Sequence, residues 1–141
     1  MTTPLISAAL AAFILVLQVG LMLTVGLHRG KTNVVIGVSD DKDLERKIRR
    51  HGNLAENAGL FIAAFAVSEL VGGRPVLFLV AAGLFAVARL SHAVSFSSLS
   101  GSHLVNGFGL FPAMRMVGAF GTFIAAVLLA VTLLGASSVL F

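Results

Sequence analysis

Four long apolar segments follow one another along the chain, separated by connections of very different character. They cover residues 5–27, 54–71, 76–96 and 116–134. A helix needs about 20 apolar residues to cross the hydrocarbon core of a bilayer, and a segment in lipid must satisfy its own backbone polar groups. The pattern therefore predicts an all-α membrane protein whose single domain, residues 1–141, is a bundle of four transmembrane helices.

The three connections differ in length and charge. The first, residues 28–53, is long and polar, and its second half is predicted to be an amphipathic helix that begins near Asp43 and runs on into the second span. The second, Gly72 to Pro75, is a tight turn with one cation, whereas the third is long and rich in Ser and Gly. The first and third connections hold eight of the ten basic residues: Arg29, Lys31, Lys42, Arg46, Lys47, Arg49, Arg50 and Arg115. Because basic loops tend to stay in the cytoplasm, we expect these two connections there and both termini on the opposite side.

Composition supports the same class of protein. Hydrophobic residues make up 57% of the chain and charged residues 11%, whereas soluble domains carry roughly 25% charged residues. The net charge of +4 comes mostly from the first connection, so it indicates topology and contact with lipid headgroups, and no nucleic-acid partner is expected. The chain has no cysteine, and its four histidines form no pair at helical spacing, so no metal or haem is predicted.

Polar groups enter the apolar segments at two places. On a helix through residues 46–61, the side chains of Arg49, Asn53 and Glu56 lie within about 60° of one another. These three could simply satisfy one another between packed helices, but ionisable groups at membrane depth are costly and usually functional. The sequence therefore leaves a packing role and a binding role open for this stripe.

A second stripe lies at the same end of the third span. Arg89, His92 and Phe96 share one helix face, although Arg89 is close enough to the span's end to extend toward the headgroups instead. Two arginine-centred stripes at one depth suit an anionic, polar ligand, because guanidinium groups bind carboxylates in a bidentate manner. Gln18, in the middle of the first span, is expected to form an interhelical hydrogen bond, and Glu69 is expected to be a charge at the opposite rim.

Small residues recur along the second, third and fourth spans, among them Gly118, Gly121 and Ala125. In membranes such residues allow helices to approach closely. Four spans enclose little interior of their own, so the polar groups within them favour a neighbouring subunit. The sequence thus predicts a tightly packed bundle that forms an oligomer.

Two motifs resemble those of a known family. The run "LERKIRRHGNLAENAGLFI" and the later "ARLSHAVSF" are similar to the second-helix and third-helix signatures of the MAPEG family, the membrane-associated proteins in eicosanoid and glutathione metabolism. The likeness is greatest to its small bacterial branch. It implies a homotrimer in the bacterial inner membrane that binds glutathione between neighbouring subunits near the cytoplasmic face. Membrane lipids and a lipophilic small-molecule substrate would be its other partners.

The resemblance also assigns residues to the glutathione site. Arg49, Asn53 and Glu56 would hold the carboxylate and amine ends of the peptide, with Arg89 and His92 completing the pocket from the third helix. The full set of implied contacts is Arg29, Arg49, His51, Asn53, Glu56, Arg89 and His92.

The chain departs from the active members of the family at two points. It has no tyrosine, and the segment after the third-helix motif lacks the arginine proposed to stabilise a glutathione thiolate. Ser98, His103 and Arg115 are the remaining candidates for activating the thiol.

The interpretation is a glutathione transferase or peroxidase-like protein acting on lipophilic electrophiles. A non-catalytic MAPEG-fold scaffold or accessory membrane subunit is the alternative. A proton-coupled transporter using Glu56 ranks last, because that residue lies at the rim of the membrane and not at its midplane.

Overall fold

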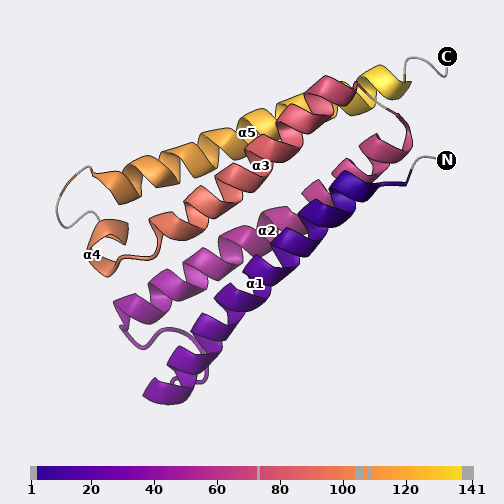
Figure 1. Cartoon of the computed structure of the whole chain (residues 1–141). Helices are drawn as coiled ribbons and strands as arrows, with labels where there is room; N and C mark the ends of the chain where they lie inside the picture. Colours follow the sequence, from indigo (N-terminus) through magenta and orange to yellow (C-terminus); the bar gives the residue numbers. More distant parts are fainter. Residues whose placement is uncertain (1–2, 73, 104–106, 108, 138–141) are drawn as a thin grey trace.

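The computed structural model describes residues 3–72, 74–103, 107 and 109–137. Within this part of the chain the secondary structure is entirely helical: α1 (Leu5–Thr32), α2 (Lys42–Leu70), α3 (Pro75–Ser95), α4 (Leu99–Ser102) and α5 (Leu110–Ser137). The long helices run alternately up and down (Figure 1). The α2–α3 turn, the start of α1 and the end of α5 share one end of the molecule, which we call the turn end. The α1–α2 connection and α4 form the opposite loop end.

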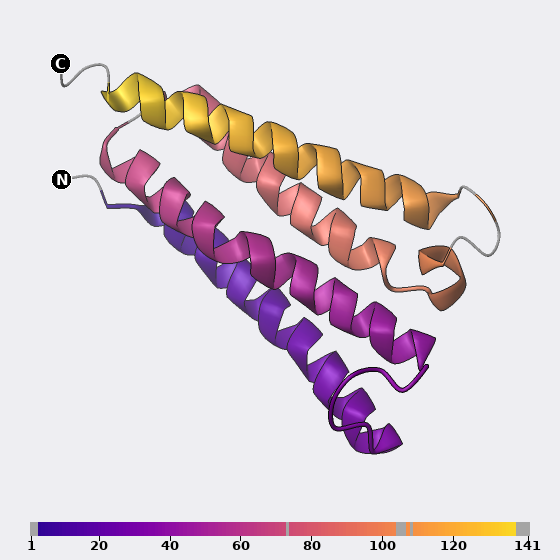
Figure 2. The same cartoon turned by 180° about the vertical axis from the view of Figure 1, so that it is seen from behind.

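Two antiparallel helix pairs make up the bundle, α1 with α2 and α3 with α5, and both views show each pair side by side (Figures 1 and 2). Small residues bring α3 and α5 together, as the sequence predicted. A Cβ atom at Gly118 would lie 2.7 Å from the Cβ of His92, and one at Gly121 would lie 2.9 Å from the Cβ of Ala88. These two glycines therefore set the distance between the helices of this pair.

Phenylalanines join the two pairs. The ring of Phe61 on α2 is stacked on that of Phe85 on α3, with centroids 4.3 Å apart. Phe65, which is fully buried, packs against Phe85 at 5.7 Å and meets Phe78 edge to face at 5.8 Å. Such pairs contribute about 0.5–1.5 kcal/mol each beyond their buried area, so this cluster fixes α2 against α3 near the middle of the bundle.

The outer surface of the bundle is apolar. Leu15, Val16 and Leu27 on α1 and Phe123 on α5 are more than half exposed. Within the described residues, α1, α3 and α5 are each long and apolar enough to cross a membrane. Lipid is the medium in which such a surface is stable, so this is an integral membrane protein.

The second predicted span is the apolar half of a longer helix. Asp41 caps α2 by accepting hydrogen bonds from the backbone amides of Asp43 (2.9 Å) and Leu44 (3.0 Å), so the helix begins at Lys42. This confirms that the polar run before Asn53 and the apolar run after it form one continuous helix.

The helices α1 and α5 also extend beyond the apolar segments that predicted them. α1 continues to Thr32, where Asn33 ends it in a left-handed conformation (φ 55°), and α5 begins at Leu110, six residues before the predicted span. Hydropathy marks the part of a helix that lies in lipid, and polar residues extend the helix beyond it. The short α4 was not predicted; the Ser98 hydroxyl caps it by accepting a hydrogen bond from the Gly101 amide (3.2 Å).

Glu69 has a specific partner at the turn end. Its carboxylate accepts hydrogen bonds from the backbone amides of Ile6 (3.0 Å) and Ser7 (2.8 Å) and from the Ser7 hydroxyl (2.6 Å). Amides in the first turn of a helix have no partner within that helix, and the positive end of the helix dipole favours an anion. Glu69 of α2 thus caps the N-terminus of α1, whose own cap position holds Pro4.

Candidate functional site

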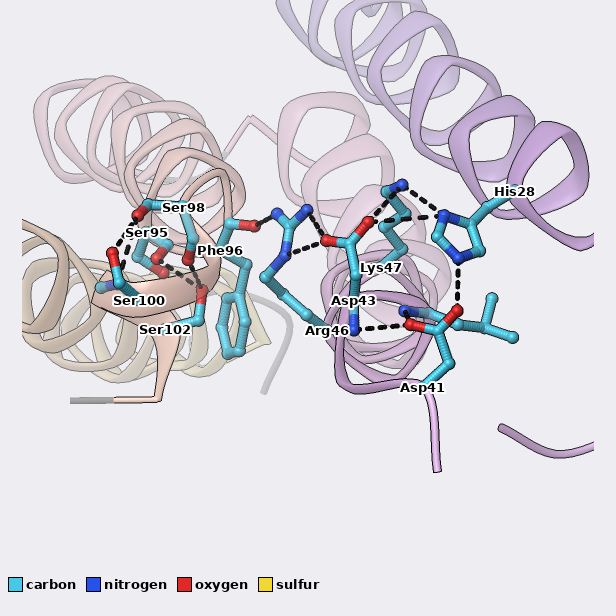
Figure 3. Close-up of polar contacts among 12 residues, drawn as sticks. His28, Asp41, Asp43, Arg46, Lys47, Ser95, Phe96, Ser98, Ser100 and Ser102 are labelled. Atoms are coloured by element: carbon cyan, nitrogen blue, oxygen red, sulfur yellow. Dashed lines mark hydrogen bonds and ion pairs between the residues drawn. The ribbon is translucent and has the colours of Figure 1, made fainter. Parts of the chain in front are cut away.

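Polar side chains connect α1 to α2 at the loop end (Figure 3). The Lys47 ammonium lies 2.7 Å from the Asp43 carboxylate and 2.6 Å from Nδ1 of His28. Because an ammonium group can only donate, Nδ1 is the acceptor and Nε2 carries the proton that His28 donates to Asp41 at 2.7 Å. The α1–α2 connection is therefore closed by a chain of polar contacts that fixes the tautomer of the histidine.

These contacts change the acidity of both carboxyl groups, which lie outside the spans. Hydrogen bonds from Lys47 and Arg46 lower the pKa of Asp43 to about 2. The hydrogen bond from His28, together with that from the Leu44 amide, lowers the pKa of Asp41. Both groups are thus held as carboxylates.

Arg46 extends this network to the other helix pair. Its side chain is 8% exposed, and its guanidinium donates to the Asp43 carboxylate and to the carbonyl of Phe96 at the end of α3 (Figure 3). Arg115 of α5 lies over the ring of Phe96, with its guanidinium carbon 4.3 Å from the centroid, and donates to the carbonyl of Ser102 at 2.7 Å. α2, α3, α4 and α5 therefore meet at the loop end around Phe96.

Arg89 lies deeper in the bundle and points inward. Its side chain is 2% exposed, so it does not extend toward the headgroups. The guanidinium donates to the side-chain oxygen of Asn53 on α2 (3.0 Å), to the Gly118 carbonyl of α5 (3.1 Å) and to the Thr122 hydroxyl of α5. No carboxylate among the described residues pairs with it, and its Nε has no hydrogen-bond partner there. A buried cation held only by neutral groups is a favourable position for an anion.

A pocket of about 340 Å³ opens beside Arg89, between α2, α3 and α5. We call it the polar pocket. Its polar lining consists of Asn53, Asn57, Arg89, His92 and Thr122. Its apolar lining consists of Phe61, Ala119, Phe123 and Ala126. The pocket therefore brings together three of the residues that the sequence implied, Asn53, Arg89 and His92, from two different helices.

Arg49 and Glu56 lie at the edge of this arrangement. Both are exposed, and neither forms a hydrogen bond or ion pair with the residues that the structure describes. The packing interpretation, in which these two satisfy each other and Asn53, is therefore not what the fold shows: Asn53 is bonded to Arg89 instead. The charged groups of the stripe remain open to a ligand or to another chain.

Two other implied contacts are directed elsewhere. Nε2 of His51 accepts a hydrogen bond from the Gln18 amide at 2.8 Å, which confirms the expected interhelical bond of Gln18 and places His51 on the side of α2 that faces α1. Arg29 donates to the carbonyls of Val34 (3.0 Å) and Val35 (3.1 Å) and so fixes the start of the first loop. Neither residue lines the polar pocket within this one chain.

The three candidates for thiol activation lie around α4 and outside the polar pocket. Ser98 caps α4, His103 is exposed just after it, and Arg115 is bonded to Ser102. The segment between α4 and α5 includes residues 104–106 and 108, which lie outside the described residues.

Sequence reasoning missed two polar residues of the pocket, Asn57 on α2 and, on α5, Thr122. Its hydroxyl donates to the Gly118 carbonyl one turn earlier (2.6 Å) and accepts from Arg89. The signal was present, because Thr122 follows Gly118 by four residues and so lies on the same face of the helix.

Buried polar groups between membrane helices define this molecule as an integral membrane protein with an intramembrane polar site. The described residues contain no group of three or more His, Asp or Glu side chains arranged to hold a metal ion. The chain belongs to the MAPEG family, whose sequence profile matches residues 7–135. No curated protein and no solved structure gives a significant match to this chain.

Proposed function

We propose that this protein binds glutathione in the polar pocket and joins it to lipophilic electrophiles that arrive from the bilayer. The observation that carries the proposal is Arg89, a buried guanidinium with no carboxylate partner among the described residues, at the wall of a pocket large enough for a ligand. Membership of the MAPEG family supports glutathione as that ligand.

The charges near the pocket match those of the peptide. Glutathione carries two carboxylates and one ammonium group. Arg89 and Arg49 would each bind a carboxylate, Glu56 would bind the ammonium, and the amides of Asn53 and Asn57 would bind the peptide groups between them. Proximity then supplies most of the catalysis.

The reaction is a sulfur–carbon bond formation. The thiol loses its proton, and its sulfur forms a bond to the electrophilic carbon. In an addition to an enone, the proton returns to the α-carbon of the substrate, so no oxidant is needed. In a peroxidase-like reaction, two thiols would form one disulfide while the O–O bond of a lipid hydroperoxide is cleaved to give an alcohol and water.

The assembly we propose is a homotrimer in the bacterial inner membrane, with α2 as the fourth span and the loop end in the cytoplasm. The outward position of Arg49 and Glu56 supports an assembly, because a second copy against this face of α2 would enclose both charged groups around the ligand. The basic first connection at the loop end supports the orientation.

Thermal unfolding of the purified protein in nanodiscs tests the proposal. A ligand that binds only the folded state raises stability by RT ln(1 + [L]/Kd), so millimolar glutathione should raise the Tm of the wild-type protein. The shift should be lost in Arg49→Ala and kept in Arg74→Ala, an exposed arginine at the turn end. Absence of any shift in the wild-type protein at millimolar glutathione would refute the binding.

A non-catalytic scaffold is the second candidate, and one observation favours it. Arg89 already connects α2, α3 and α5 through its bonds to Asn53, Gly118 and Thr122, which is a sufficient structural role. A scaffold would show no Tm shift with glutathione and no glutathione conjugate of a lipophilic enone. It would instead be purified in stoichiometric complex with another membrane protein.

A further inference from the structure

The loop between α1 and α2 carries an exposed apolar tip. Val35 is 84% exposed and Ile36 is 87% exposed, the highest values among the large hydrophobic side chains that the structure describes. Gly37 follows them with a positive φ of 71°, and the loop is flanked by Lys31 at the end of α1 and Lys42 at the start of α2. Single exposed apolar residues are common, but two adjacent ones beside a membrane span form a surface that is unfavourable in water.

Two contacts hold this loop against the last turns of α1 (Figures 1 and 3). The Arg29 guanidinium donates to the carbonyls of Val34 (3.0 Å) and Val35 (3.1 Å), and His28 donates to Asp41 at the far end of the loop (2.7 Å). Because helical side chains lean toward the N-terminus of their helix, Arg29 draws the loop back along α1. The exposure of the tip is therefore a fixed property of the fold.

The face of α1 that meets the loop is apolar and exposed. Leu15 and Met22 precede Arg29 by fourteen and seven residues, so the three side chains share one face of the helix. Leu15 is 63% exposed and Met22 is 49% exposed, as expected for a face that contacts lipid. Arg29 follows the apolar segment 5–27 by only two residues, so the loop is held where hydrocarbon meets the lipid headgroups.

We propose that Val35 and Ile36 insert between the headgroups and the upper acyl chains of the leaflet at the loop end, while Lys31 and Lys42 bind the phosphates of anionic lipids. Neither lysine forms a hydrogen bond or ion pair with the residues that the structure describes. Apolar side chains next to cations are the combination by which segments bind an anionic membrane surface. Tryptophan and tyrosine usually hold a span at this boundary, and this chain has neither, so the loop tip supplies the anchor.

The absence of tryptophan makes a fluorescence test direct. Ile36→Trp is introduced into the full-length protein in nanodiscs of phosphatidylcholine and phosphatidylglycerol, with and without bromine atoms on the upper acyl chains. We expect emission at a shorter wavelength and strong quenching by the brominated lipid, comparable to that of Met22→Trp in the span. Thr32→Trp, at the exposed end of α1, should instead be quenched by acrylamide in the water.

Tryptophan itself prefers the headgroup region, so a smaller probe must agree with it. The chain has no cysteine, and Ile36→Cys and Thr32→Cys each introduce a single thiol. A charged, water-soluble maleimide should modify Ile36→Cys severalfold more slowly than Thr32→Cys in the same nanodiscs. Equal rates would show that the native tip lies in water, and would overturn the proposal.

The two lysines are tested through the charge of the lipid. Each lysine near an anionic surface favours the bound state by about fivefold, so Lys31→Gln and Lys42→Gln should each lower the ratio of inserted to water-exposed tip by about that factor. The ratio is measured from the quenching of Ile36→Trp by brominated lipid and by acrylamide. Arg74→Gln removes an exposed cation at the turn end and should leave the ratio unchanged.

The remaining outcomes would overturn the inference. Quenching of Ile36→Trp by acrylamide to the same extent as Thr32→Trp would place the tip in water. Shielding from both quenchers would mean that protein, such as a second copy of this chain, covers the tip. Equal quenching in neutral and anionic nanodiscs, with no effect of either lysine variant, would exclude the headgroup contacts. Glutathione takes no part in these measurements, so their result is independent of the proposed function.

Discussion

The two helix pairs are held together by different forces. Polar side chains join α1 and α2 at three levels: Glu69 to Ser7 at the turn end, His51 to Gln18 in the middle, and His28 to Asp41 at the start of α2. The α3–α5 pair depends on close approach at its glycines, with the Ser91 hydroxyl donating to the Met114 carbonyl (2.8 Å) as a supporting contact. Lipid supplies no hydrophobic drive between helices, so each pair relies on hydrogen bonds or close packing.

Because of this difference, the two helix pairs should be destabilised by different kinds of change. The α1–α2 pair should respond to changes of charge and pH, whereas the α3–α5 pair should respond to changes of side-chain volume. Arg89 belongs to the second pair but donates to Asn53 of the first, so the polar pocket is built where the two kinds of association meet.

The largest expected effect comes from adding one methyl group to the α3–α5 contact. In Gly118→Ala the new Cβ would lie 2.7 Å from the Cβ of His92 and 3.0 Å from the carbonyl oxygen of Ala88, so the two helices must separate. We expect a loss of about 2 kcal/mol in the free energy of unfolding, as for other overpacked contacts. Denaturant unfolding in detergent micelles measures it.

Gly83→Ala is the matched control on α3. No atom lies within 4 Å of a Cβ at this position, and an alanine in a helix is more favourable than a glycine by roughly 0.5–1 kcal/mol. The control should therefore be neutral or stabilising. Equal losses in both variants would show that glycine spacing does not hold this pair together.

The next effect concerns the cap of α1. Glu69→Ala removes the acceptor of the Ile6 and Ser7 amides and should cost about 1–2 kcal/mol, with faster hydrogen exchange confined to the first turn of α1. Glu56→Ala removes an exposed carboxylate from the same helix, where it has no bond to the described residues, and should change stability by less than about 0.5 kcal/mol. Similar exchange at the start of α1 in both variants would contradict the capping role.

The smallest effect is a pH dependence of the α1–α2 pair. Because the pKa of Asp43 is lowered to about 2 in the folded protein, its contribution is complete above the ordinary carboxyl pKa of about 4 and is lost as the pH falls from there to about 2. We expect about 1 kcal/mol, since water screens this partly exposed carboxylate. Asp43→Asn should show a smaller fall in Tm between pH 5 and pH 2 than the wild-type protein, and the part due to Asp41 should remain. A wild-type slope retained by the variant would assign the dependence to other groups.

The sequence predicted the positions of the helices along the chain better than the face that each helix turns toward its neighbours. Apolar length located α1, α3 and α5, and the cap at Asp41 explains why the polar run before Asn53 is already helical. A helical wheel relates side chains on one helix to each other, but it does not say which neighbour that helix faces. For this reason it placed Asn53 on one stripe with Arg49 and Glu56, but could not show that only Asn53 turns toward Arg89.

The same limit applies to the residues assigned by resemblance. His51 faces α1, and Arg29 is bonded within its own loop, because contacts with the nearest helix and loop decide where these side chains point. Thr122 was missed because it lies in an apolar span and becomes significant only when α5 is packed on α3. Whether Arg49 and Glu56 hold a ligand stays a prediction, which the glutathione experiment tests.

The cap that Glu69 provides also bears on the order in which the chain is made. Glu69 follows Ser7 by 62 residues, so α1 leaves the ribosome well before its capping group exists. Until α2 has been synthesised and lies antiparallel to it, the first amides of α1 have no carboxylate to bind. We therefore expect α1 alone to keep its leading turn in contact with water or headgroups until α2 has joined it.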